Sequence, residues 1–147
     1  MSFQIRNAGP EDGQVIATIL SDFIDETPWM VRIHTREEDR QFGANLIEKT
    51  DVWVADQGGV LGFIACRNNT VEALYVHTDH RGQGVGTELL KMAMNRFDDL
   101  GLWTFQANAG ARRFYARNGF IEGEMTDGER NDENLPDVHM RWTGKAT

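Results

Sequence analysis

Between residues 81 and 87 the sequence reads Arg-Gly-Gln-Gly-Val-Gly-Thr, and these residue types are suited to binding a phosphate group. Glycine allows a backbone to adopt positive φ and to come close to a ligand. An apolar strand over 71–76 precedes the run, and an amphipathic helix with Leu89, Leu90 and Phe97 on one stripe follows it. The first turn of such a helix directs unpaired N–H groups and a positive dipole end at the loop. The segment therefore predicts an anion site.

Three phosphate-binding patterns compete for this loop. A Walker loop requires a lysine before Thr87, and none is present. A dinucleotide fingerprint requires G-x-G-x-x-G, whereas the spacing here is Gly82-x-Gly84-x-Gly86. The third pattern, [Q/R]-x-x-G-x-[G/A], fits from Arg81 to Gly86, and it is the pyrophosphate loop of the GNAT superfamily of acetyl-CoA-dependent N-acetyltransferases. The sequence resembles that superfamily here; the simpler alternative is a glycine-rich turn that only caps a helix.

A second run, from Asn108 to Phe120, resembles the other GNAT motif, N-x-x-A-x-x-F-Y-x-x-x-G-F. Asn108 is a good N-cap, and Ala111 and Tyr115 follow it at i+3 and i+7, on the same side of the helix. We therefore expect Asn108 and Tyr115 to line one cleft, with the small Ala111 between them. The alternative is that Asn108 only caps the helix and Tyr115 only fills the core. The presence of both motifs in this order favours the functional interpretation.

The resemblance implies that acetyl-CoA is the cosubstrate and that a primary amine attacks its thioester directly. It implies that the Leu74 N–H meets the acetyl oxygen, that Val76 pairs with the pantetheine arm like an added strand, and that N–H groups of the loop hold the pyrophosphate. The cofactor-binding residues expected are Leu74, Tyr75, Val76, Arg81, Gly82, Gln83, Gly84, Val85, Gly86, Thr87, Asn108 and Tyr115.

The implied reaction needs three catalytic groups; the resemblance implies the Leu74 N–H for one of them, and Tyr115 and Glu72 are the candidates for the other two. The N–H stabilises charge on the acetyl oxygen, and the Tyr115 hydroxyl is the candidate acid for the leaving thiolate. The amine must lose a proton before it attacks, and Glu72, expected to share a strand face with Leu74 and Val76, is the candidate base. A structural ion pair is the equally weighted alternative for Glu72. Arg112 and the residue after it either reach the CoA phosphates or are simply solvated.

Composition limits the partners. The 147 residues carry a net charge of −8, which argues against nucleic-acid binding because that requires a basic face. Cys66 is the sole cysteine, so no intrachain disulfide forms. No apolar run approaches the roughly 18 residues of a membrane span, and residues 1–12 lack a signal-peptide core. We therefore expect a cytoplasmic protein without membrane partners. We also expect no metal site, because His77 and His80 lack further ligands at a suitable spacing.

The elements predict a single domain of the α/β (α+β) class, and the resemblance implies that it is one GNAT domain over residues 1–147. The expected fold is a mixed central sheet of about seven strands flanked by about four helices, in the order β-α-α-β-β-β-α-β-α-β-β. The sheet should splay between the strands around Val71–Val76 and Leu102–Ala107. In the helix expected over 37–49, the predicted inward residues are Phe42, Leu46 and Ile47.

The acceptor, a small-molecule or protein amine, is not specified by any motif. The resemblance places acceptor specificity in segments 25–36 and 129–137. Within the first segment, Trp29 either packs in the core or lies on a flexible lip of a substrate groove. A homodimer is also consistent with the resemblance, because family members often pair. The alternative function is a sensor module of the same fold that binds acyl-CoA without turnover.

Overall fold

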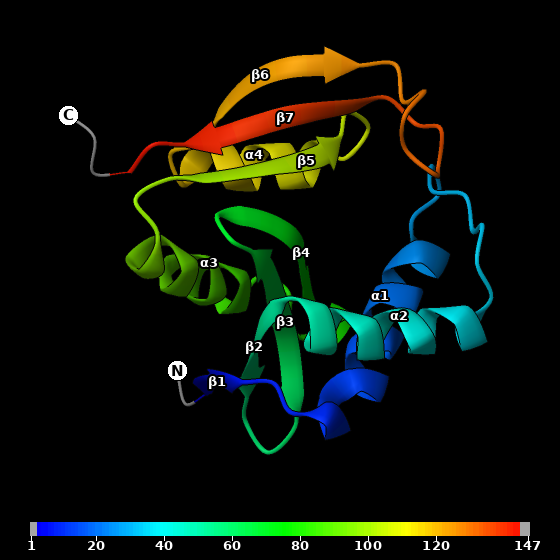
Figure 1. Cartoon of the computed structure of the whole chain (residues 1–147), viewed down its shortest axis with the longest axis vertical. Helices are drawn as coiled ribbons and strands as arrows, with labels where there is room; N and C mark the ends of the chain where they lie inside the picture. Colours follow the sequence, from blue (N-terminus) through cyan, green and yellow to red (C-terminus); the bar gives the residue numbers. More distant parts are fainter. Residues whose placement is uncertain (1–2, 145–147) are drawn as a thin grey trace.

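A computed structural model of the protein describes residues 3–144 and contains one seven-stranded sheet in the order β1-β2-β3-β4-β5-β7-β6. Together with the four α-helices in the described range, this confirms the predicted fold class (Figure 1). The strands are β1 (Gln4–Asn7), β2 (Asp51–Asp56), β3 (Val60–Arg67), β4 (Thr70–Val76), β5 (Leu100–Phe105), β6 (Ile121–Thr126) and β7 (Asp137–Trp142). The helices are α1 (Gly13–Glu26), α2 (Arg36–Lys49), α3 (Val85–Arg96) and α4 (Ala109–Arg117), with short 3-10 turns η1 (Pro10–Asp12) and η2 (Thr78–His80).

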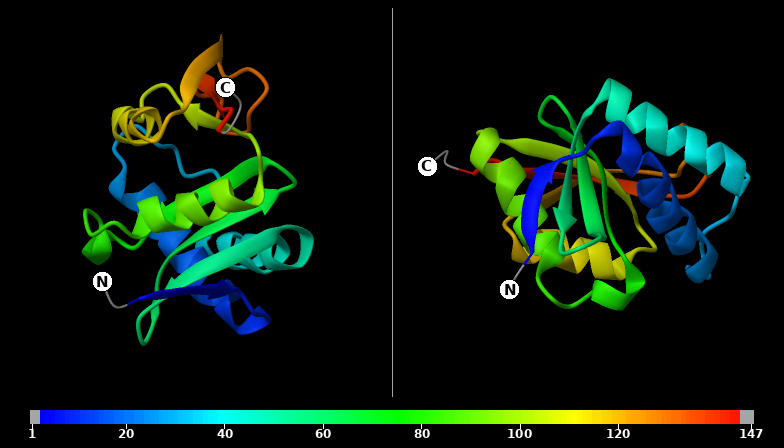
Figure 2. Two further views of the ribbon diagram at one scale, coloured as in Figure 1. Left: turned by 90° about the vertical axis from the view of Figure 1, so that its left-hand side faces the viewer. Right: turned by 90° about the horizontal axis from the view of Figure 1, so that it is seen from below.

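The sheet is covered on both faces over β2–β4, as the two views in Figure 2 show. Successive residues of β2 point to opposite faces. Trp53 packs into a cluster with Leu90 of α3 and Tyr115 of α4, whereas Val54 packs into a second cluster with Ile16 of α1. The two buried clusters fix the strands between the helix pairs, so that α3 and α4 share one face.

Strands β4 and β5 part almost where they begin. Thr70 and Gly101 are the single residue pair that links them in the described chain, although β4 pairs along its other edge with β3, and β5 pairs with β7. Glu72 is an extra residue in β4 where the register with β3 shifts, and such a bulge bends a strand and increases its twist. The strands β5, β7 and β6 therefore run across β2–β4 at a steep angle in Figure 1. This opening is the predicted splay.

Two local predictions need correction. Phe42 was predicted to face inward, but it is 45% exposed. The reason is that α2 contacts α1 through Gly43, where an added Cβ would lie 2.5 Å from the Gly13 carbonyl oxygen, so the preceding residue is turned about 100° away. The strand predicted over 102–107 runs instead from Leu100 to Phe105, because residues 106 and 107 form a turn before α4.

Candidate functional site

The loop between η2 and α3 has the backbone that its glycines predict. Gly82 and Gly84 have φ values of +77° and +82°, in the left-handed region that favours glycine. Gly84 is the N-cap of α3, and its carbonyl accepts the first helical hydrogen bond, from the Glu88 N–H at 3.0 Å. The N–H groups of residues 85–87 therefore have no partner within the helix. They form an electropositive helix end suited to a phosphate group.

A cavity of about 350 Å³ opens on this loop. Besides the loop, it reaches the end of β4 and the last turn of α4. Its lining residues are Val76, His80, Arg81, Gly82, Gly84, Val85, Gly86, Thr87, Phe114 and Arg117.

A second cavity, of about 430 Å³, shares four lining residues with the first, so the two form one continuous cleft. Eleven of the twelve residues predicted to bind the cofactor line this cleft; Gln83 does not. The second cavity is lined by Phe23, Leu74, Tyr75, Val76, Arg81, Gly86, Asn108, Gly110, Ala111, Phe114 and Tyr115.

The edge of β4 that faces the cleft offers free peptide groups. The His77 N–H donates to the Leu61 carbonyl at 2.7 Å. Every second residue of β4, counted back from His77, therefore directs its peptide groups toward β3. Adjacent residues of a strand direct their peptide groups to opposite edges, so Leu74 and Val76 direct theirs toward the parted β5. The Arg81 Nε donates to the Val76 carbonyl at 3.3 Å, which marks that edge as accessible.

Tyr115 is 8% exposed and lies in the wall of the second cavity. Its ring packs against Phe114 and Phe120, with centroids 5.2 and 5.3 Å away. Burial raises the pKa of the Tyr115 phenol well above its ordinary value, and the neighbouring Tyr75 adds to the shift. The hydroxyl is protonated at neutral pH, as an ordinary tyrosine is, and so carries a proton that it could donate.

Asn108 has the predicted capping role. Its Oδ1 accepts a hydrogen bond from the Ala111 N–H at 3.0 Å, and the residue also lines the cleft. The two interpretations of Asn108, cap and cleft residue, thus coexist. Tyr115, seven residues later, faces the same cavity, as the helical spacing predicted.

Arg81 lines the cleft as predicted, but the arginine that α4 contributes to the cleft is not the one that the sequence singled out. Arg112 binds Glu122 through two hydrogen bonds of 2.6 and 2.8 Å and donates to the Gln106 carbonyl, outside the cleft. Arg117, one helical turn and a half further on, lines the loop cavity and forms no ion pair with residues 3–144 that the structure records. Its spacing from the Asn108 cap gave no signal, because a residue at i+9 lies on the opposite side of a helix.

Glu72 lies apart from the cleft. It lines neither cavity, and its carboxylate accepts a hydrogen bond from the Arg67 Nε at 3.2 Å in an exposed ion pair. The bulge at Glu72 interrupts the alternation that was predicted to place it on one face with Leu74 and Val76. The placement therefore matches the ion-pair alternative.

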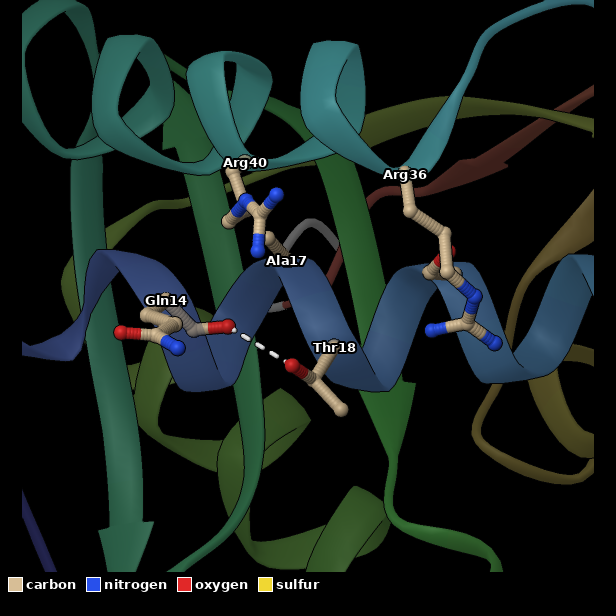
Figure 3. A pocket seen from close by; sticks show the side chains of 6 residues that line it. Gln14, Ala17, Thr18, Arg36 and Arg40 are labelled. Carbon is tan, nitrogen blue, oxygen red and sulfur yellow. Dashed lines mark hydrogen bonds between the residues drawn. The ribbon is translucent and has the colours of Figure 1, made fainter.

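A smaller hollow of about 70 Å³ lies between α1 and α2, on the other side of the sheet (Figure 3). Arg36 and Arg40 line it, but both guanidinium groups are engaged by carboxylates. The hollow thus offers no free cation for an anionic ligand. Within residues 3–144, no group of three or more His, Cys, Asp or Glu side chains is arranged to hold a metal ion, and no helix is long and apolar enough to cross a membrane.

Comparison with known proteins agrees with this geometry. The model of the family described as the acetyltransferase (GNAT) domain matches residues 48–122. The chain belongs to the GNAT acetyltransferase family. This GNAT protein is an N-acetyltransferase enzyme whose cosubstrate is acetyl-CoA.

Two of its relatives carry the same name, peptidyl-lysine N-acetyltransferase YjaB. The protein from Salmonella typhimurium is 28% identical over 82% of this chain and 84% of its own length. The protein from Escherichia coli is 26% identical over 98% and 99%, respectively.

Solved structures share the fold. The solution structure of apo YjaB from Escherichia coli has a TM-score of 0.81 at 23% identity, and it covers 98% of this chain and 99% of that one. The structure of yncA from Salmonella typhimurium with its cofactor acetyl-CoA has a TM-score of 0.74 at 20% identity, with 100% and 97% covered.

Proposed function

We propose that this enzyme acetylates the side-chain amine of lysine in a protein or peptide. Two relatives that align with most of the chain are named peptidyl-lysine N-acetyltransferases, which supports this acceptor class. The net charge of −8 is compatible with a cationic lysine-rich partner. The acceptor amine is the part of the proposal that extends beyond family membership.

The observation that carries the site assignment is the continuous cleft. It joins the loop of residues 81–87, the free edge of β4 and Tyr115. The N–H groups of residues 85–87 would hold the pyrophosphate, and Arg117 adds a positive charge beside them. Peptide groups of Val76 would pair with the pantetheine arm.

Bound acetyl-CoA supplies the activated thioester. The Leu74 N–H would donate to the acetyl oxygen, where negative charge develops. The neutral amine would attack the thioester carbon and the C–S bond would break. The Tyr115 hydroxyl would give its proton to the departing sulfur and recover one from the acetylated nitrogen. The lysine ammonium, with an ordinary pKa of about 10.4, releases its proton to water before attack, because Glu72 lies in an ion pair outside the cleft.

The test is incubation with acetyl-CoA and a lysine-containing peptide, with free thiol measured over time and the product mapped by mass spectrometry. We expect peptide-dependent thiol release and a mass increase of one acetyl group on the lysine Nε. Release with small amines alone would contradict the peptide acceptor. Thermal stabilisation by acetyl-CoA without release for any amine would instead support the sensor alternative, in which binding stabilises the fold without turnover.

A further inference from the structure

A row of aromatic rings crosses the gap between β4 and β5 on the side away from α3. Phe23 lies 5.0 Å from Tyr75 and 6.4 Å from Trp29, and Trp29 lies 5.7 Å from Phe105, measured between ring centroids. The row thus begins on β4, passes over the end of α1 and the following loop, and ends on β5. It connects two strands that share one residue pair elsewhere.

The row begins inside the cleft. Phe23 and Tyr75 line the same cavity as Leu74 and Tyr115, the groups proposed to act on the thioester. Trp29 and Phe105 extend the row beyond this cavity, and Trp29 is half-buried. An amine that approaches the thioester from the side opposite the loop of residues 81–87 would therefore contact Phe23 and Tyr75, next to Trp29 in the row.

The loop that carries Trp29 is held firmly. Arg32 donates to the Asp39 carboxylate at 2.7 Å, to the Ser21 hydroxyl at 2.6 Å and to Asp25 at 2.8 Å. Asp39 and Ser21 are 4% and 2% exposed, so these bonds lie mainly inside the protein. The aromatic row is thus anchored before an acceptor binds, which reduces the entropy cost of binding.

Aromatic faces of this kind suit an unbranched aliphatic arm that ends in a cation. Methylene groups pack on the rings, and an ammonium group is attracted to their faces. The charge on Glu133 also acts on the hydroxyl end of Tyr75, where it raises the phenol pKa together with the larger effect of burial. A negative charge near that end of the row favours an incoming ammonium group.

We propose that Trp29 is a specificity-determining residue of the acceptor site, against which the four-carbon arm of a lysine side chain lies as its nitrogen reaches the cleft. The proposal rests on the proposed lysine acceptor and adds the surface that selects for the length of the acceptor side chain. Shorter arms place fewer methylene groups on the rings when the nitrogen is at the thioester.

The experiment compares Trp29→Ala, Trp29→Phe and wild type on one peptide that carries lysine, ornithine or diaminobutyrate at the same position. We expect wild type to prefer lysine. Trp29→Ala should raise the KM for the lysine peptide about tenfold, as loss of one aromatic contact implies, and should weaken the preference for the longer arm. Trp29→Phe should keep a KM for the lysine peptide close to that of wild type and much of the preference for the longer arm. The KM for acetyl-CoA should stay unchanged in all three proteins.

Trp103→Ala is the matched control. Trp103 is 47% exposed, contacts the edge of His139 with centroids 5.0 Å apart, and is not part of the aromatic row. Trp103→Ala should leave the KM for each peptide and the KM for acetyl-CoA unchanged. The proposal is overturned if Trp29→Ala keeps the wild-type KM and arm-length preference. It is also overturned if the rise in the peptide KM is accompanied by a loss of acetyl-CoA affinity and a lower Tm. If wild type itself gives no peptide acetylation, the proposed function has failed, which is a separate result.

Discussion

The two sides of the cleft differ in how they are built. The proposed cofactor side consists mainly of main-chain groups: N–H groups of residues 85–87, the free edge of β4 and a loop that depends on Gly82 and Gly84. The proposed acceptor side consists of side chains, with the aromatic row around Trp29 and the ion pairs of Arg32. A ligand held by main-chain groups requires a fixed local sequence, whereas a surface of side chains can vary with the acceptor. The two sides should therefore respond to different substitutions.

The largest effect is expected on the cofactor side, from Gly84→Glu. The substitution brings a negative charge to the proposed phosphate site and forces a side chain onto a φ of +82°. We expect loss of measurable acetyl-CoA binding by calorimetry, at least a hundredfold, since two or more N–H contacts to an anion are lost.

The matched control for this variant is Gly58→Glu. Gly58 has a φ of +74° in the β2–β3 turn, and an added Cβ there meets no atom within 4 Å. It carries the same backbone strain and the same added charge away from the cleft. Acetyl-CoA affinity that is equal in the two variants would mean that the loop is not the phosphate site.

Tyr115→Phe should have the next largest effect. If its hydroxyl protonates the departing sulfur, kcat should fall about 100-fold, while acetyl-CoA affinity and Tm stay close to wild type because the ring is retained. Single-turnover and steady-state rates with the lysine peptide measure this effect. A variant with the wild-type kcat would exclude Tyr115 from the chemistry.

The pH dependence offers a second check on the same residue. Burial raises the pKa of Tyr75 to about 12 and that of Tyr115 above its ordinary value, so both phenols stay protonated at neutral pH. A raised folded-state pKa gives stability that is complete below the unfolded value of about 10 and is lost as pH rises beyond it. We expect unfolding free energy to decline from about pH 10 upward, with a smaller decline in Tyr115→Phe. An alkaline fall in kcat between pH 7 and 9 in wild type but not in Tyr115→Phe would contradict a raised pKa.

On the acceptor side, Arg32→Ala should weaken the fold and the acceptor site together. It leaves the Asp39 carboxylate buried with the Ser21 hydroxyl as its remaining partner, which we expect to cost about 2 kcal/mol of unfolding free energy. The loop that holds Trp29 loses its anchor, so the peptide KM should rise several-fold while the KM for acetyl-CoA stays constant. Denaturant titration and steady-state kinetics measure the two effects.

Arg36→Ala is the control for Arg32, because both guanidinium groups bind Asp25. The bonds of Arg36 are exposed and therefore contribute little to stability. Its substitution should change neither the Tm appreciably nor the peptide KM. Equal losses in the two variants would show that the buried bonds of Arg32 do not anchor the loop.

The same contrast explains what could be predicted from sequence. The loop of residues 81–87 and the Asn108–Tyr115 spacing depend on local backbone geometry, so the sequence predicted an anion-binding loop and a shared helix face. The family resemblance supplied the expectation that both line one cleft. The aromatic row joins residues 23, 29, 75 and 105, and no local pattern relates positions so far apart. Arg117 was missed for a similar reason, since only the three-dimensional approach of α4 to the loop places it there. Phe42 was misplaced because Gly43, with no hydrophobic signal, makes the contact between α1 and α2.

The smallest effect is expected from Glu72→Gln, and it tests the boundary of the site. The carboxylate pairs with Arg67 at the surface and lines neither cavity, so kcat/KM for the peptide should change less than about threefold, the range of a weak exposed ion pair. Arg67→Gln should match it, and the double variant should add nothing further, since a pair is lost only once. A fall of two orders of magnitude confined to Glu72→Gln, with a shifted acidic limb of the pH profile, would instead identify this carboxylate as the base that deprotonates the amine.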